Sequence, residues 1–315
     1  ALIQSGVSMP KLVLAVAVEQ PRFGVMQRSA FRQRGDATPL APIMSTTPIP
    51  LTLSLTLHRD LDISTLDELP AGRQQVATRW LPPERRPAAY GFIRKEVEAG
   101  RQGFVICPLV GESDTIESKA AIAEHKRLSE EVFPDLRVGL LHGRMPAKEK
   151  DAVMRRFREG EVDVLVSTAV VEVGIDVANA TVMLIDGADR FGLAQLHQFR
   201  GRVGRGEHKS YCILMSDTVS ETAKERLSAL ARIQDGFKLA EVDLELRGPG
   251  DFFGTRQSGL PSLKMAHLTD LELLEMARNE ATKLMGDDPD LKQPDHAGIA
   301  AQVARFVDQA SANVA

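Results

Sequence analysis

Short apolar runs alternate with stretches of helical periodicity between residues 90 and 216. The runs are Phe104–Leu109, Arg137–Leu141, Val162–Val166, Thr181–Ile185 and Ser210–Met215. Helical stretches near 113–131 and 146–159 separate the first three runs. Short apolar runs that alternate with helices predict a parallel sheet with crossover helices. We therefore expect an α/β fold, with a doubly wound domain of five strands over 90–216.

The residues before this domain divide into two parts. Residues 11–18 and 40–44 are apolar and short, as in buried parallel strands. Residues 67–89 are rich in Pro, Gly and Arg, which predicts a solvated linker. We therefore expect a partial domain over 1–66 and a linker over 67–89.

From about Asp217 the pattern becomes helical. Leu227, Leu230 and Ile233 recur three residues apart, as on one face of a helix. The expected helices are Glu221–Ile233, Phe237–Leu246, Asp270–Leu284 and Gly298–Ala310, with a polar connection over 286–295. Residues 217–315 thus form a helical region.

Composition narrows the function classes. Hydrophobic residues make up 43% and charged residues 26% of 315 residues, which is ordinary for a globular protein. The formal net charge is −4, so any contact with nucleic acid must use local basic patches. The two cysteines, Cys107 and Cys212, lie in apolar runs and are expected to be core residues in a reducing compartment. With no signal peptide and no apolar run near 18 residues, we expect a cytoplasmic protein without a membrane segment.

The stretch Gln195–Gly206 carries the strongest candidate chemistry. Three arginines (Arg200, Arg202 and Arg205) and three glycines lie within seven residues. Guanidinium groups bind phosphate well, and glycine lets the backbone approach a ligand. The stretch therefore predicts arginines placed against the phosphates of a nucleotide. The alternative is a solvated basic turn.

Two further candidates follow predicted strands. Ser167 and Thr168 could bind phosphate or cap a helix, and the nearby Gly174 and Asp176 could line the same loop. His142, Gly143 and Arg144 could contact a phosphate backbone or form an ordinary turn. Ligands of such sheets bind beyond the carboxyl ends of the strands. We expect Thr168, Arg202 and Arg205 to lie there together.

The signatures of several other reactions are missing from the sequence. No G-x-x-x-x-G-K-[ST] loop occurs in the 315 residues, so no lysine lies in a glycine cradle for phosphates. No H-E-x-x-H, C-x-x-C pair or Ser/His/Asp elbow occurs either. Metal-dependent hydrolysis and acyl transfer therefore lack candidate residues.

The stretches around these candidates resemble motifs of superfamily 2 helicases, and most closely those of the RecG family. Leu140–Met145 resembles the neighbourhood of motif IV, and Ser167–Val177 resembles motif V. In Gln195–Gly206, Gln198, Arg202 and Arg205 match the Q-x-x-G-R-x-G-R pattern of motif VI.

The region after motif VI extends the resemblance. Asp243–Gly250 and Gly254–Gly259 resemble the helical hairpin and loop that couple ATP-driven motion to DNA translocation. The transcription-repair coupling translocase shares this element. The Gly-Pro-Gly and Gly-Thr-Arg-Gln wording, which includes Thr255, Arg256 and Gln257, favours RecG.

The N-terminal part resembles the end of a first motor domain. Ser45–Pro50 resembles motif III, with Thr46 where the family has Ala, and Glu19–Gly24 resembles motif II. Glu19 matches the water-activating base, but Val18 stands where the family has Asp and Pro21 where it has His. A valine cannot hold Mg²⁺, which needs oxygen ligands.

The resemblance implies two RecA-like motor domains: a remnant of the first over 1–66, and the second over 90–216 followed by the RecG-type helical region. It implies ATP and Mg²⁺ as cofactors, branched or forked DNA as partner, and a monomer. Three sets of site residues carry over by motif: catalytic Arg202, Arg205 and Glu19; nucleotide-binding Gln198, Gly174 and Asp176; and DNA-binding or coupling His142, Gly143, Arg144, Thr168, Thr255, Arg256 and Gln257.

The missing phosphate loop predicts that this chain does not hydrolyse ATP by itself. Three hypotheses therefore remain open. The chain is a portion of a helicase, a non-catalytic DNA-binding module that has kept the fold, or an inactive structural remnant.

Overall fold

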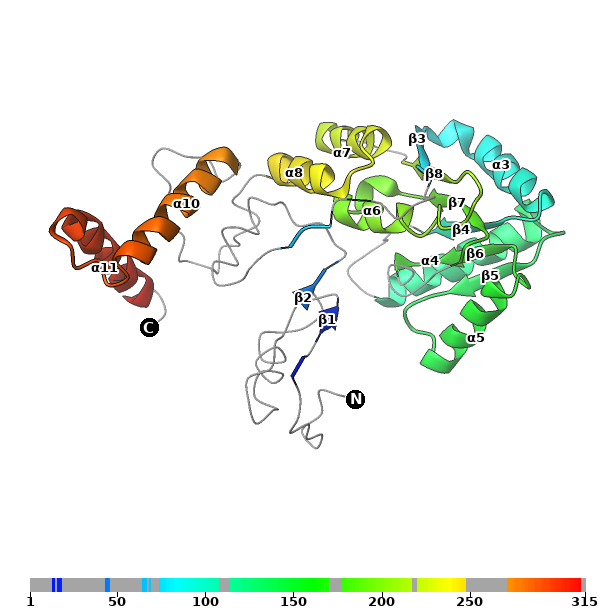
Figure 1. Ribbon diagram of the computed structural model, residues 1–315. Coiled ribbons are helices and arrows are strands. Elements are labelled where there is room, and N and C mark those ends of the chain that lie inside the picture. Colours follow the sequence, from blue (N-terminus) through cyan, green and yellow to red (C-terminus); the bar gives the residue numbers. More distant parts are fainter. Residues whose placement is uncertain are drawn as a thin grey trace. The chain divides into compact units, whose positions relative to one another are not determined.

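The computed structural model describes residues 13–14, 16–18, 43–45, 64–66, 68, 74–107, 114–169, 177–216, 220–247 and 271–312. The chain divides into two compact units, Ala1–Pro48 and Ile49–Ala315. Figure 1 labels strands and helices of both units. In the first unit, the described residues form a parallel pair of short strands, β1 (Ala17–Val18) and β2 (Ile43–Met44). Both lie within the ranges predicted as buried strands, but the predicted burial does not hold for Val16 and Met44, which are exposed.

The second unit contains a parallel sheet of six strands in the order β3-β8-β7-β4-β6-β5. The strands are β3 (Ala77–Leu81), β4 (Gln102–Ile106), β5 (Val138–Leu141), β6 (Val164–Ser167), β7 (Ala180–Ile185) and β8 (Tyr211–Met215). The α/β fold and the five predicted strands are confirmed, with ends shifted by a few residues.

The prediction of a linker over the whole of 67–89 was wrong, because β3 lies inside that range and pairs with β8. β3 is an edge strand of mixed composition, with Arg79 exposed and Trp80 packed against the core. An edge strand has only one strand neighbour to bury it, so it lacks the continuous apolar run of a central strand.

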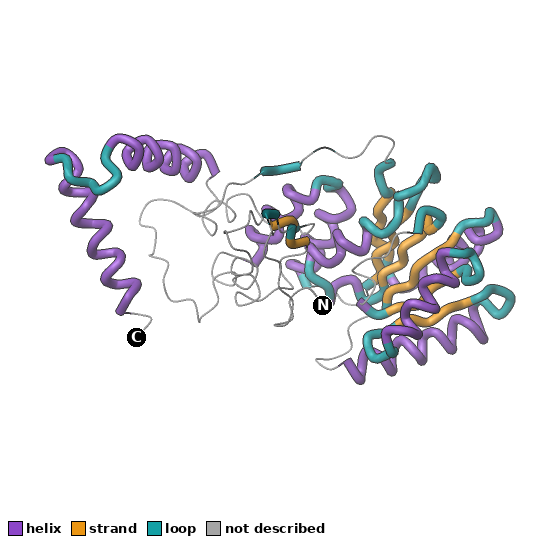
Figure 2. The backbone as a smooth tube through the Cα atoms, turned by 60° about the horizontal axis from the view of Figure 1, so that its bottom comes forward, coloured by secondary structure: helices purple, strands orange, loops and turns teal. Residues whose placement is uncertain are grey.

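Helices cover both faces of the sheet (Figure 2). On one face, α3 (Arg86–Glu98) and α4 (Asp114–Arg127, continued by a π-helical turn to Val132) pack on alternate strand residues such as Val105 and Val182. On the other, α5 (Ala147–Arg158), α6 (Leu193–Arg200), α7 (Glu221–Arg232) and α8 (Gly236–Arg247) cover residues such as Phe104.

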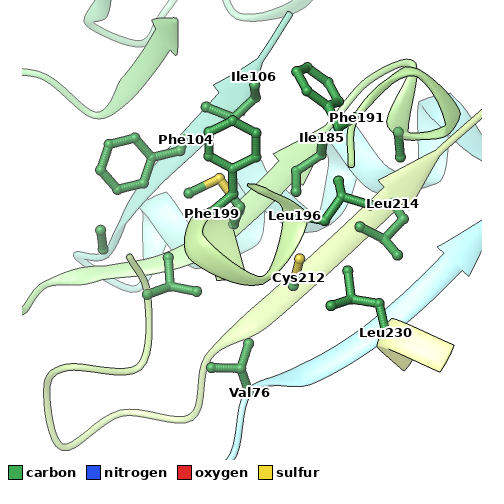
Figure 3. Close-up of a cluster of buried hydrophobic side chains, with 14 of the residues drawn as sticks. Val76, Phe104, Ile106, Ile185, Phe191, Leu196, Phe199, Cys212, Leu214 and Leu230 are labelled. Carbon is green, nitrogen blue, oxygen red and sulfur yellow. The ribbon is translucent and has the colours of Figure 1, made fainter. Parts of the chain in front are cut away.

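The core under α6 and α7 is dense and aromatic (Figure 3). Phe191 and Phe199 meet edge to face with ring centroids 5.4 Å apart. Leu196 of α6 and Leu230 of α7 are fully buried in the same cluster. Helix α6 was not predicted, although its apolar residues recur three apart, because its glycine- and arginine-rich end favoured a loop.

The predicted C-terminal helices are confirmed. They are α7, α8, α10 (Leu271–Asp287) and α11 (Ala297–Ala312), with a 3₁₀ turn (η6, Pro294–His296) before α11. The Ser220 hydroxyl accepts a hydrogen bond from the Ala223 amide and so caps the start of α7. Among the helices that the structure describes, none is both long and apolar enough to cross a membrane.

Candidate functional site

His142 and Thr168 lie side by side at the carboxyl edge of the sheet. They follow β5 and β6, which pair in parallel with Leu141 opposite Ser167. The Thr168 amide donates to the Leu141 carbonyl at 3.2 Å, and this bond joins the two strand ends. The tertiary structure therefore brings together two of the residues predicted to contact DNA, from positions 26 residues apart in the sequence.

The environment of these side chains limits what each can offer. Thr168 is only 5% exposed, and the Ser167 hydroxyl donates to the Thr168 carbonyl. Burial, followed by the nearby charges of Lys150 and Arg144, lowers the pKa of His142. His142 is thus a neutral hydrogen-bonding group at pH 7, and its buried Nδ1 meets no hydrogen-bonding group within the described residues.

The turn after His142 adds positive charge at this edge. Arg144 is exposed, as is Gly143, and a Cβ built on Gly143 would meet no atom within 4 Å. The Lys150 side chain donates to the Gly143 carbonyl and closes the turn onto α5. The turn is therefore a compact, solvent-facing group with a basic side chain, which suits contact with phosphate.

The loop with Arg202 and Arg205 lies at the opposite, amino edge, so the prediction that it joins Thr168 was wrong. A Cβ on Gly204 would lie 2.8 Å from Val76, which directly precedes β3. A Cβ on Gly206 would lie 2.4 Å from the carbonyl oxygen of Ala178, which precedes β7. The reason is topological: in a parallel sheet, the segment that leads into a strand reaches the edge where strands begin.

Gly204 and Gly206 allow this loop to pack closely against the segments that precede β3 and β7. Gly204 has φ +77°, a left-handed conformation that favours glycine. Gly206 leaves no space for a side chain beside the Ala178 backbone. The predicted reason for them, close approach to a ligand, is therefore not needed at Gly204 and Gly206.

Arg205 is exposed on this closely packed loop. Its Nε donates to the Gly201 carbonyl at 3.0 Å, a bond that restrains the guanidinium relative to the end of α6. Arg202 and Gln198 are half-buried nearby in sequence, Gln198 within α6 and Arg202 just beyond it. The structure thus presents Arg205 to solvent from a firmly held backbone.

Arg200, the first arginine of the stretch, faces inward. It is 3% exposed and donates to the carbonyls of Leu230, Ile233 and Gln234 at 2.8, 2.8 and 3.0 Å. These carbonyls lie where α7 ends and α8 is about to begin. Its charge is therefore used to hold α7 and the start of α8 beside α6, and Arg200 is not one of the arginines predicted to be catalytic.

A turn over 186–191 positions the start of α6, and no sequence pattern indicated its contacts. Arg86 of α3 binds the Asp186 carboxylate through both terminal nitrogens, at 2.6 and 2.9 Å. The Ser216 hydroxyl donates to the Asp189 carboxylate at 2.6 Å. The hydrogen bond to Asp186 raises the pKa of Arg86 further, so this arginine is charged throughout the usable pH range. The only available signal was an acid directly after a buried strand.

Six of the predicted site residues lie outside the described residues. They are Glu19, Gly174, Asp176, Thr255, Arg256 and Gln257. The two cysteines are described and buried, as predicted. Burial raises the pKa of Cys212 to about 12 and that of Cys107 well above its ordinary value, so both stay protonated thiols.

Two family models match the chain. Residues 89–207 match the helicase conserved C-terminal domain, and residues 233–313 match the C-terminal part of domain 3 of the ATP-dependent DNA helicase RecG. The chain is 51% identical over 293 residues to the ATP-dependent DNA helicase RecG of Synechocystis, covering 93% of this chain and 35% of that protein. It is 49% identical over 298 residues to RecG of Bacillus subtilis, covering 94% of this chain and 44% of that protein.

Solved structures agree with these matches. A structure of RecG bound to a three-way DNA junction has a TM-score of 0.67 at 45% identity, covering 87% of this chain and 35% of that one. Yeast Dbp5 bound to RNA and ADP BeF3 has a TM-score of 0.52 at 16% identity, which shows a shared fold; the match covers 76% of this chain and 64% of that one. The chain thus spans 35% and 44% of the lengths of the two RecG proteins named above.

Proposed function

Because the chain belongs to the RecG family of helicases, we propose that it supplies one motor domain and the translocation element of an ATP-dependent DNA helicase. The whole protein would remodel branched DNA and stalled replication forks in recombination and repair. The similar RecG structure is bound to a three-way DNA junction, which supports branched DNA as the partner. We propose that the protein acts as a monomer.

The observation that carries this proposal is the arginine loop at the amino edge of the sheet. Arg205 is exposed and tied to Gly201, and glycine contacts hold the backbone on either side of it. The guanidinium group of an exposed arginine can donate two hydrogen bonds to the phosphates of ATP. Bound ATP would supply the phosphoryl group that is transferred to water. Arg205, with Arg202 beside it, would stabilise the negative charge that develops during hydrolysis.

The remaining residues at the nucleotide have smaller proposed roles. Gln198 and Asp176 would bind the nucleotide, with Gly174 allowing the close approach of the backbone, and Glu19 would activate the attacking water. Mg²⁺ would accompany ATP, and its oxygen ligands must come from residues other than Val18, which has none. The phosphate loop must come from a part of the protein outside these 315 residues.

We place DNA at the opposite edge of the sheet. His142, Gly143 and Arg144 form a solvent-facing turn there, beside Thr168. Arg144 would bind backbone phosphate and the neutral His142 would donate or accept a hydrogen bond. Thr255, Arg256 and Gln257 would couple the motor to movement along DNA. Placing ATP and DNA at different edges leaves the sheet and its helices to link the two events.

The proposed domains follow from the sheet. We propose that residues 1–66 belong to the first motor domain, that the second motor domain includes β3 and ends near residue 216, and that 217–315 form the RecG-type helical region. The match of 233–313 to RecG domain 3 favours RecG over the transcription-repair coupling translocase. A non-catalytic DNA-binding module is the second candidate, and the solvent-facing basic turn at Gly143 and Arg144 favours it.

The test is an ATPase assay on a chain that is extended by a phosphate-loop motor domain. We expect DNA-stimulated hydrolysis that falls by roughly 10³-fold or more in Arg205→Ala, since an arginine finger contributes about that much. Arg158→Ala is the matched control, because Arg158 is exposed on α5 and donates only within its own helix in the bond that the structure records. Equal rates in the Arg205 variant and the parent would contradict the proposal.

A further inference from the structure

Arg226 of α7 binds the turn that precedes α6. Its two terminal nitrogens donate to the carbonyls of Phe191 and Asp189, at 3.3 and 3.0 Å. Both carbonyls lie at the end of the 3₁₀ turn η5 (Ala188–Arg190), where backbone acceptors lack partners within the turn. One side chain thus satisfies two acceptors from an element 35 residues earlier in the chain.

Burying part of the Arg226 guanidinium costs folding free energy, which an exposed surface hydrogen bond does not. The Arg226 Nε is buried and meets no hydrogen-bonding group within the described residues. A buried, unsatisfied donor destabilises a fold, and each such group in a native protein needs a reason. A simple gain in stability is therefore a poor explanation for an arginine at this position.

The far end of α6 has the reciprocal contact. Arg200, at the last residue of α6, donates to carbonyls at the end of α7, as described above. Arg226, within α7, donates to carbonyls just before α6. Arg200 of α6 thus binds backbone at the end of α7, and Arg226 of α7 binds backbone that leads into α6. Phe199 and Leu230 both belong to the core cluster on this face of the sheet (Figure 3).

We propose that Arg226 is a positioning residue: with Arg200 it staples α6 to α7 at both ends and so fixes the loop that carries Arg202 and Arg205. Helix α6 has eight residues and is therefore a rigid rod of about 12 Å between the turn and the arginine loop. A displacement of the turn would reach Arg202 and Arg205 at the other end of the rod. The inference rests on the proposed function only for the role of these two arginines.

Hydrogen exchange in the 315-residue chain tests the staple without ATP or DNA. In Arg226→Gln we expect the amides of 186–206 to exchange about tenfold faster or more, because hydrogen bonds to charged donors are lost. Arg226→Lys keeps the charge but cannot donate to both carbonyls, so its exchange should be intermediate. Exchange in the strands β4 and β7 should not change.

Arg232→Gln is the matched control, because Arg232 lies on the same helix, is exposed, and donates to Ser228 of its own helix. Unchanged exchange of 186–206 in Arg226→Gln would overturn the proposal. Equal acceleration in β4 and β7 would also overturn it, because it would mean a general loss of stability. If Arg226→Gln does not fold, the same criteria apply to Arg226→Lys. None of these results depends on whether the extended chain hydrolyses ATP, so a failure here is distinct from a failure of the proposed function.

Discussion

The backbone beside Gly206 leaves no space for a side chain at this position. A Cβ at this position would lie 2.4 Å from the carbonyl oxygen of Ala178, a distance that real Cβ atoms do not adopt. Because the obstacle is backbone, it cannot move aside as a flexible side chain can. A Cβ added to Gly143, at the other edge of the sheet, would meet no atom within 4 Å. The two glycines occur in motifs that look equally important in the sequence, but only Gly206 is required by packing.

Substitution by alanine should therefore separate them. We expect Gly206→Ala to lower the free energy of unfolding by about 1–3 kcal/mol, the usual cost of overpacking. Gly143→Ala should change it by no more than about 0.5 kcal/mol, as for exposed sites. Urea unfolding followed by circular dichroism measures both. Equal midpoints for the two variants would show that the loop before β8 moves aside without cost.

At the scale of elements, a single carboxylate organises the connection between α10 and α11. Asp288 is 6% exposed and accepts from the Lys292 amide, the Gln293 amide and His296 Nδ1, at 2.9, 2.9 and 2.8 Å. The amide of Gln293, and then His296, lower the pKa of Asp288. The predicted polar connection over 286–295 is thus a folded corner, because its acid has donors to bind.

This corner should loosen in acid. A carboxylate with a lowered pKa stabilises the fold above its ordinary pKa of about 4, and the contribution is lost as the pH falls through the lowered value. We expect protection of the Lys292 and Gln293 amides, corrected for intrinsic rates, to fall below about pH 4.

Asp288→Asn should give weaker protection that no longer changes over the same pH range. The Ala223 amide is an internal reference, since its acceptor is the Ser220 hydroxyl, which does not titrate there. Protection at Lys292 and Gln293 that is constant with pH in the parent chain would contradict the assignment.

For the whole molecule, the formal net charge of −4 means that DNA binding must depend on where charges are placed. Helix α5 runs from the carboxyl edge of the sheet toward the amino edge, where β6 begins. Substitutions at its two ends therefore test which edge of the sheet contacts DNA. Arg144 is exposed just before α5, and Arg158 is exposed at its last residue. Replacing either arginine by alanine changes the net charge by the same amount. Any difference in DNA binding between the two variants therefore depends on where the arginine lies.

We expect Arg144→Ala to weaken binding of forked DNA and to reduce the slope of log affinity against log salt by about one, as for loss of one phosphate contact. Arg158→Ala should leave both quantities unchanged. Fluorescence anisotropy at several salt concentrations measures them in the 315-residue chain. Equal slopes in the two variants would place the DNA elsewhere, and no binding at low salt would count against a DNA-binding role for this chain.

Local patterning in the sequence was enough to predict the class of fold. The central strands β4 and β7 are buried on both faces, so most of their residues are apolar, and the buried polar residues Gln102 and Thr181 make side-chain hydrogen bonds. Helix α7 shows its buried face as Leu227 and Leu230. The edge strand β3 was missed because only part of its surface is covered. Helix α6 was missed because Arg200, a buried residue, reads as a surface residue in any sequence pattern.

The sequence by itself determined the parallel sheet, most of its helices and the motifs that resemble superfamily 2 helicases, because hydrophobic periodicity and motif spacing are local properties. Only the tertiary structure decided that Thr168 and Arg205 lie at opposite edges, since that depends on the direction in which each connection crosses the sheet. It also decided that Arg200 and Arg226 act inside the protein. Their partners are backbone carbonyls about 30 or more residues away, which no local pattern can reveal.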